Sequence, residues 1–139
     1  DEVNLKVDPI ARKWHSQLHT AGHLVAEAVG TLFPELEAYQ GNHYPNNSFV
    51  KFKIHAPMQT ENKDEIIQKA VAKFRSWIDQ DLKVAVKFES SGLRSVQVFQ
   101  NWSPCGGTHV KNLKEIGQMR ISGLSINRKE STVTIKYAL

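Results

Sequence analysis

Three histidines lie four residues apart in the N-terminal part of the sequence, at positions His15, His19 and His23. In a helix, residues four apart lie on the same face, and two imidazoles in that relation can bind one metal ion. His15 and His23 are two turns apart, about 12 Å along the axis, and cannot bind the same ion. The spacing therefore predicts a metal-binding pair that contains His19. It leaves open whether the partner is His15 or His23.

A second four-residue spacing occurs far downstream, in SPCGGTHV, where Cys105 and His109 flank Gly106, Gly107 and Thr108. Thiolate and imidazole are ligands that zinc prefers, and tetrahedral sites are often built from two such pairs. Glycines allow backbone angles and close approaches that a side chain would block. The alternative is that the histidines are ordinary surface or core residues and that Cys105 is a buried apolar side chain. The two pairs together favour a zinc site.

The segments that must position these residues have the patterns of helices and paired strands. We expect helices over 9 to about 30 and about 63 to 80, and strands over 37–40, 48–54, 83–89, 95–100, 117–126 and 131–137. Asp8 and Asn62 are placed to cap the helices. Short turns join the strands of each pair, which favours an antiparallel sheet. The predicted fold is α+β, a two-layer sandwich with an α-β(2)-α-β(2) core and a C-terminal hairpin.

Apolar residues at helical spacing mark the faces that these helices should bury. The expected stripes are Trp14, Leu18, Ala21, Val25, Ala28 and Leu32 in the first helix, and Ile67, Val71, Phe74 and Ile78 in the second. His43 and His55 fall at expected turn or strand-end positions and are interpreted as plain surface residues. Trp102, three residues before Cys105, is a candidate wall of the binding pocket.

Composition limits the classes of protein that fit. The 139 residues match one domain, residues 1–139, and contain no apolar run long enough for a membrane span. The single cysteine excludes an internal disulfide and fits a reducing compartment, so we expect a cytoplasmic protein. The first residues lack the signal-peptide pattern, and the missing initiator Met fits a chain that is trimmed or is excised from a longer one. The net charge of +4 permits an RNA partner without requiring one. Nothing in the composition fixes the oligomeric state.

The segment HTAGHLVAEAV resembles the HxxxH motif of the editing domain shared by alanyl- and threonyl-tRNA synthetases. The segment SPCGGTHVKNLKEIG resembles the CxxxH partner motif of that domain, in the CGGTH form of the alanyl branch. Over residues 12 to about 126 the chain is most similar to free-standing alanyl-tRNA editing proteins of the AlaX type. The resemblance leaves His15 out and implies the zinc ligands His19, His23, Cys105 and His109.

The resemblance also implies a reaction, the zinc-dependent removal in trans of serine or glycine from wrongly charged tRNA(Ala). Gln40 and Gly41 correspond to a Gln-Gly segment that lines the amino-acid pocket of the family. The backbone N–H groups of Gly106, Gly107 and Thr108 are candidates to stabilise the oxyanion. Four protein ligands normally close a zinc site, so zinc either exchanges a ligand for water, expands to five, or positions the substrate. Two other functions fit the sequence: a tRNA-binding module without turnover, and a zinc hydrolase of another ester.

Two features of the sequence bear on substrate recognition: the glycine at position 22 and a set of four lysines. Position 22 often carries a small hydroxylated residue in the family, so Gly22 is expected to widen the pocket and to weaken the discrimination of serine from alanine. Gln40 or Thr108 would then replace the missing hydroxyl, and glycine would remain a substrate. The basic residues Lys51, Lys53, Lys111 and Lys114 are expected to contact acceptor-stem phosphates, the alternative being solvated side chains.

Overall fold

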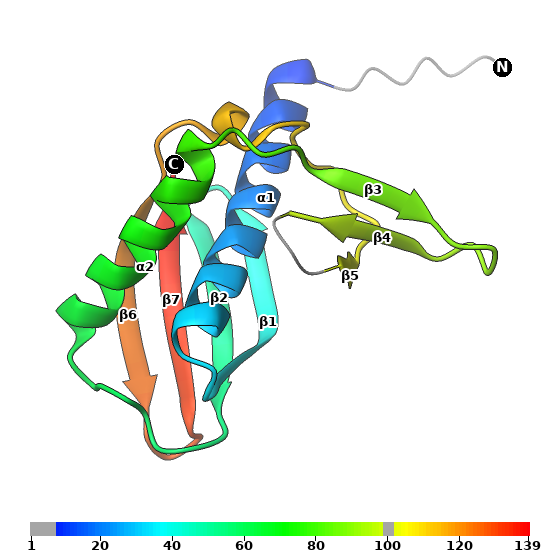
Figure 1. Ribbon diagram of the computed structural model, residues 1–139. Coiled ribbons are helices and arrows are strands. Elements are labelled where there is room, and N and C mark those ends of the chain that lie inside the picture. The colour runs from blue at the N-terminus through cyan, green and yellow to red at the C-terminus, as the bar shows by residue number, and fades with distance from the viewer. Residues whose placement is uncertain (1–7, 99–101) are drawn as a thin grey trace, which may run out of the picture.

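A four-stranded antiparallel sheet and two helices form two layers in the computed structural model, which describes residues 8–98 and 102–139 (Figure 1). The helices α1 (Pro9–Leu32) and α2 (Lys63–Asp79) lie on one face of the sheet (Figure 1). The sheet has the strand order β1-β2-β7-β6 and contains β1 (Leu36–Tyr44), β2 (Asn47–Ile54), β6 (Arg120–Asn127) and β7 (Thr132–Ala138). The predicted α+β class and antiparallel pairing are confirmed.

A second, smaller sheet extends beside α1 (Figure 1). It has the order β3-β4-β5 and contains β3 (Ala85–Phe88), β4 (Arg94–Gln97) and β5 (Trp102–Pro104). The middle pair of strands therefore does not join the main sheet, and the C-terminal hairpin completes that sheet instead, with β7 beside β2. β5 and the 3-10 helix η1 (Leu113–Ile116) were not predicted, because such short elements show no periodicity. Phe99 and Gln100, expected at the end of a strand, lie outside the described residues.

The helix ends follow partly from capping residues and partly from the core. The Asp8 carboxylate accepts hydrogen bonds from the backbone N–H groups of Ile10 and Ala11, and the Asn62 side chain accepts one from that of Glu65. α1 continues past Gly30 to Leu32, where the N–H of the buried Phe33 bonds to a helix carbonyl. The helix therefore ends two residues beyond the predicted end at about residue 30.

The core lies between the helices and the main sheet. Leu18, Ala21, Val25 and Ala28 of α1 are buried as predicted, whereas Trp14 is 46% exposed because the first turns of α1 extend past the sheet (Figure 1). In α2, Phe74 and Ile78 are buried as predicted, but in the first half of the helix the buried residues are Ile66 and Ala70 instead of Ile67 and Val71. Its buried residues are Ile66, Ala70, Phe74, Trp77 and Ile78. Neither helix of the described chain is long and apolar enough to cross a bilayer.

The hairpin β1–β2 is longer than the sequence suggested. β1 pairs with β2 from Leu36↔Ile54 to Tyr44↔Asn47, so the turn shrinks to two residues, and Asn46 there has a φ of 66°. The expected loop from Gly41 to Tyr44 is therefore strand, because pairing with β2 satisfies its backbone hydrogen bonds. This places His43 on a strand instead of in a turn.

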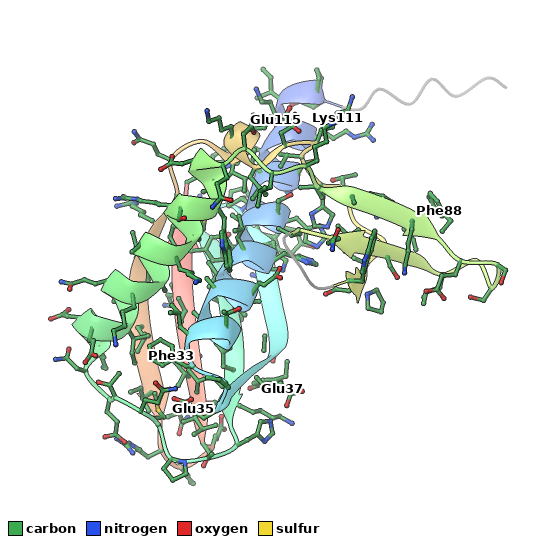
Figure 2. All side chains as sticks on the ribbon, in the orientation of Figure 1. Phe33, Glu35, Glu37, Phe88, Lys111 and Glu115 are labelled. Atoms are coloured by element: carbon green, nitrogen blue, oxygen red, sulfur yellow. The ribbon has the colours of Figure 1, made fainter. Side chains whose placement is uncertain are left out.

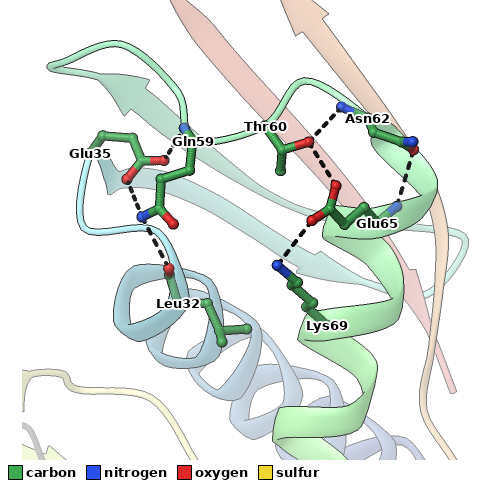
Figure 3. A network of polar contacts seen from close by, with 7 residues as sticks. All are labelled: Leu32, Glu35, Gln59, Thr60, Asn62, Glu65 and Lys69. Carbon is green, nitrogen blue, oxygen red and sulfur yellow. Dashed lines mark hydrogen bonds and ion pairs between the residues drawn. The ribbon is translucent and has the colours of Figure 1, made fainter.

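Polar contacts fasten the C-terminal end of α1 to the segment before α2 (Figure 3). The Glu35 carboxylate, which is buried, accepts hydrogen bonds from the backbone N–H of Gln59 at 3.0 Å and from its side-chain amide at 3.2 Å. Thr60 Oγ1 donates to the Glu65 carboxylate at 2.9 Å, and Lys69 Nζ lies 2.9 Å from the other oxygen of that carboxylate. In this network the carboxylates of Glu35 and Glu65 both face N–H or O–H hydrogen-bond donors.

Candidate metal centre

Four side chains from two distant segments converge beside α1. One ligand atom from each of His19, His23, Cys105 and His109 lies within 4.8 Å of all the others. Cys105 Sγ lies 3.4 Å from Nε2 of His19 and 3.4 Å from Nε2 of His109. His15 is exposed, and its ring meets the Tyr44 ring edge-on at 6.1 Å. Of the two histidine pairs that the helical spacing allowed, the structure therefore brings together His19 and His23.

The loop after β5 is held beside β4 by hydrogen bonds to its backbone carbonyl groups. Nη1 of Arg94 on β4 donates hydrogen bonds to the carbonyl oxygens of Cys105 at 3.0 Å and Gly107 at 2.6 Å. A Cβ at Gly107 would overlap the imidazole of His19, so only glycine fits there. A Cβ at Gly106 would meet nothing within 4 Å, which leaves the backbone at that residue open.

Hydrogen bonds from neighbouring groups fix the proton positions of two histidines. His19 Nδ1 lies 3.1 Å from the carbonyl oxygen of Thr108, which can only accept, so Nδ1 carries the proton. Thr20 Oγ1 donates to the carbonyl oxygen of Ser16 at 2.9 Å and lies 2.9 Å from His109 Nδ1. Since the hydroxyl has one proton, Nδ1 of His109 must be the donor to Thr20. Both rings therefore present an unprotonated Nε2 toward Cys105.

The histidines of this centre are neutral at ordinary pH. Burial, followed by the nearby histidines His19 and His43, lowers the pKa of His23 to about 4. Burial, followed by the neighbouring His19 and His23, lowers the pKa of His109 to about 3, and burial is also the main cause of the lowered pKa of His19. Metal binding requires neutral imidazoles. Three such rings and one thiol are a donor set that fits zinc, so the chemistry of these residues is compatible with the ion.

A cavity of about 560 Å³ opens beside the centre, and His23 belongs to both. Gly22, Gln40 and Gly41, the residues expected to form an amino-acid pocket, line it. The rest of its wall is formed by Ala26, Glu27, Ala38, Tyr39, His43, Val50, Val98, Ser103 and Pro104. Trp102, the candidate wall residue, is not among the lining residues, although its neighbour Ser103 is.

His43 is the residue of this region that the sequence interpretation missed. Its Nδ1 lies 2.6 Å from the hydroxyl of the buried Tyr137, and its ring centroid lies 5.2 Å from that of His19. Burial and the neighbouring His19 lower its pKa to about 4. A side chain at Gly22 would overlap this ring, so the expected widening beside Gly22 is absent. Strand alternation carried through position 44 would have placed His43 on the same side as Gly41.

Thr108 contacts α1 outside the cavity wall, whereas Lys51 and Lys53 lie on the main sheet. Thr108 Oγ1 lies 3.0 Å from Ser16 Oγ, and Thr108 is not among the residues that line the cavity. Lys51 and Lys53 alternate along β2 with buried Val50 and Phe52 and so lie on the outer face of the main sheet. Lys53 Nζ stands 5.1 Å from the ring centroid of Tyr39, a cavity residue.

Lys111 lies at the opposite end of α1 from Glu35 and Glu37 (Figure 2), and Lys114 belongs to η1. Figure 2 shows Lys111 and Glu115 beside the first turns of α1. Lys111 and Lys114 are exposed, and the Glu115 carboxylate accepts from the backbone N–H of Lys111 at 2.8 Å. Lys51 and Lys53 thus lie on β2 of the main sheet, whereas Lys114 lies in η1 and Lys111 lies just before it.

Comparison with known proteins agrees with the two motifs. Residues 93–134 match the family described as "Threonyl and Alanyl tRNA synthetase second additional domain". The chain is 29% identical over 129 residues to the alanyl-tRNA editing protein AlaX-M of Pyrococcus horikoshii, an alignment that covers 86% of this chain and 54% of that protein. The chain therefore spans about half the length of this relative. The predicted resemblance to AlaX-type editing proteins is confirmed.

Proposed function

We propose that this chain, similar in sequence to AlaX-type editing proteins, is a zinc-dependent hydrolase that removes serine or glycine from wrongly charged tRNA(Ala) in trans. The observation that carries the proposal is the convergence of three histidines and Cys105 beside a cavity lined by Gln40 and Gly41. The similarity to an alanyl-tRNA editing protein supports the substrate class. Charged tRNA is used in the cytoplasm, which we propose as the compartment.

Residues of the chain would divide the work of ester hydrolysis. His19, His23, Cys105 and His109 would hold the zinc ion, which supplies positive charge to polarise the ester or to activate a nearby water. Gly106, whose backbone is open to solvent, would approach the ester most closely. The N–H groups of Gly106, Gly107 and Thr108 would donate hydrogen bonds to the oxyanion that forms when water attacks the carbonyl carbon.

The cavity would receive the amino acid, and basic residues would bind the tRNA. Lys53, whose Nζ lies 5.1 Å from the ring centroid of the cavity residue Tyr39, would meet the 3′ end. Lys51 precedes it on the same face of β2, and Lys111 lies two residues after His109. Lys114 is further from the centre along the chain, and we expect it to contribute least to phosphate binding.

The test is deacylation of tRNA(Ala) charged with serine, glycine or alanine by protein with measured zinc content. We expect serine and glycine to be released faster than alanine, with loss of activity on chelation and recovery when zinc is returned. Tight binding of charged tRNA without release of the amino acid would instead indicate a binding module. Release of small esters at rates equal to those of charged tRNA would indicate a general esterase.

A further inference from the structure

The His43 ring on the cavity wall lies directly against two glycines, Gly22 and Gly41. A Cβ at Gly22 would overlap its Cε1 and Nδ1, and a Cβ at Gly41 would lie 2.9 Å from its Cε1 and Nε2. The two glycines, one on α1 and one on β1, thus leave the space that the His43 ring fills. Any larger residue at either position would displace the ring. The arrangement therefore holds one imidazole in one place on the cavity wall.

Tyr137 fixes which nitrogen of His43 carries the proton. The Tyr137 hydroxyl donates its only proton to the carbonyl oxygen of Leu18 at 2.8 Å, so its oxygen can only accept from His43 Nδ1 at 2.6 Å. Tyr137 is 2% exposed, and this hydrogen-bond chain runs from the buried Leu18 on α1 through Tyr137 on β7 to His43 on β1. In the neutral ring Nε2 is then an acceptor, and among the described residues it has no hydrogen-bond partner.

An acceptor on this wall can distinguish amino acids that otherwise fit the cavity equally. The cavity shares His23 with the metal centre, so an ester bound at that centre would place its α-carbon and side chain near His43. A serine hydroxyl can donate to Nε2, whereas the methyl group of alanine and the hydrogen of glycine cannot. Sites that bond a substrate hydroxyl discriminate much more strongly than apolar pockets do.

We propose that His43 is the specificity-determining residue of this cavity, whose Nε2 accepts a hydrogen bond from the hydroxyl of a serine esterified to tRNA. This inference rests on the proposed function for the substrate class. Gly22 then provides room for His43 and does not represent a missing hydroxyl group. Gln40 and Thr108 need not replace that group.

The kinetic test compares His43→Ala with His55→Ala, a matched control at an exposed histidine that pairs with Glu37. The ratio of kcat/KM for serine- over alanine-charged tRNA(Ala) should fall about tenfold in His43→Ala, the worth of one neutral hydrogen bond. The fall should come from the serine value, with zinc content unchanged, and His55→Ala should keep the wild-type ratio. An unchanged ratio, or equal losses for serine, alanine and glycine, would overturn the proposal.

Substitution at Gly22 tests whether the His43 ring occupies the space beside that residue. Gly22→Thr alone should lower the serine-over-alanine ratio or the melting temperature, because its side chain would overlap His43 and the Tyr137 hydroxyl. Gly22→Thr combined with His43→Ala has room for the new side chain. Its hydroxyl should recover part of the lost discrimination. If Gly22→Thr alone raises the ratio with a full complement of zinc, the assignment of His43 is wrong.

A binding measurement keeps this proposal separate from the proposed function. The probes are amide-linked seryl and alanyl analogues of the terminal adenosine, which resist hydrolysis. In ¹⁵N spectra of the zinc-loaded protein, His43 Nε2 should appear unprotonated and should shift with the seryl analogue only. Equal shifts with both analogues, or a protonated Nε2, would refute the role of His43 even if the enzyme is active. A seryl-specific shift without any turnover would support His43 and refute the hydrolase.

Discussion

Two polar clusters flank α1, and they differ in how their groups are matched. Around Glu35 and Gln59, each carboxylate oxygen meets N–H donors, and Glu65 likewise meets Thr60 and Lys69 (Figure 3). Such a network is complete without any added group. It joins segments of the fold and stabilises them.

The candidate metal centre has the opposite composition. The Nε2 atoms of His19 and His109 both face Cys105 Sγ, while their Nδ1 protons are directed outward to Thr108 and Thr20. Lone pairs therefore converge on one point, and a cation is the group that would match them. The two clusters thus differ in that acceptors face one another in the His/Cys cluster, whereas donors and acceptors are paired internally around Glu35 and Glu65.

The largest effect should follow from removing a ligand of the metal centre. Cys105→Ala or His109→Ala should reduce zinc affinity by more than about a hundredfold, since even outer partners of ligands are worth 10–100-fold. His15→Ala, a histidine one turn away on the same helix, should keep full zinc content. Elemental analysis after dialysis measures the zinc content that each variant retains. Loss of zinc from His15→Ala with retention in His23→Ala would contradict the assigned pair.

A smaller effect should follow from removing the outward hydrogen bond of a ligand. Thr20→Val deletes the acceptor of His109 Nδ1 and of the Val110 N–H, so zinc affinity should fall by about 10–100-fold. Thr60→Val removes the corresponding hydroxyl from the other cluster and should leave zinc affinity unchanged. Competition with a chromogenic chelator gives both dissociation constants. Equal affinities in the two variants would show that Thr20 does not orient His109.

Acid should destabilise the two clusters over different pH ranges in the zinc-free protein. The folded pKa values of His23 and His109, about 4 and about 3, lie below the ordinary 6.5, so the unfolded chain binds more protons. Their contribution to stability is full above pH 6.5 and is lost as the pH falls toward 3. Burial opposes the lowering of the Glu35 pKa, but hydrogen bonds from Gln59 prevail, so its contribution is lost only below 4.5.

Urea unfolding of the zinc-free protein at pH 7, 5.5 and 4 measures these two ranges. The midpoint should already fall between pH 7 and 5.5, and His23→Asn should make that fall smaller. Gln59→Ala should leave it unchanged. A wild-type midpoint that is constant from pH 7 to 5.5 would contradict the neutral, buried state of the histidines.

The smallest effect should come from the structural cluster itself. Gln59→Ala removes the side-chain amide that bonds the Glu35 carboxylate, while the backbone N–H of residue 59 remains. The free energy of unfolding should fall by about 1 kcal/mol, the usual net worth of one hydrogen bond. Zinc affinity should not change. A loss of zinc in this variant would mean that the two clusters are coupled through α1.

Local patterns were enough to predict the helices, their N-terminal caps, the antiparallel hairpins and two candidate ligand pairs, Cys105 with His109 and His19 with a neighbouring histidine. Asp8 and Asn62 cap α1 and α2 through hydrogen bonds to backbone N–H groups two or three residues away, so the sequence alone predicts these caps. The four-residue spacings place His19 beside His23 and Cys105 near His109 for the same reason. Choosing between His15 and His23 required either the family resemblance or the structure, because helical periodicity treats both alike.

Contacts between distant segments decided the rest. The middle strands form a separate sheet, and β7 pairs with β2, because side-by-side placement of strands depends on packing and not on local pattern. His43 shows this most clearly. Its own neighbours in sequence suggested a turn, but pairing with β2 made a strand, Gly22 left the space, and Tyr137 fixed the ring. A side chain's chemistry can be read from its sequence position only when its partners are local, and the partners of His43 lie on three different elements.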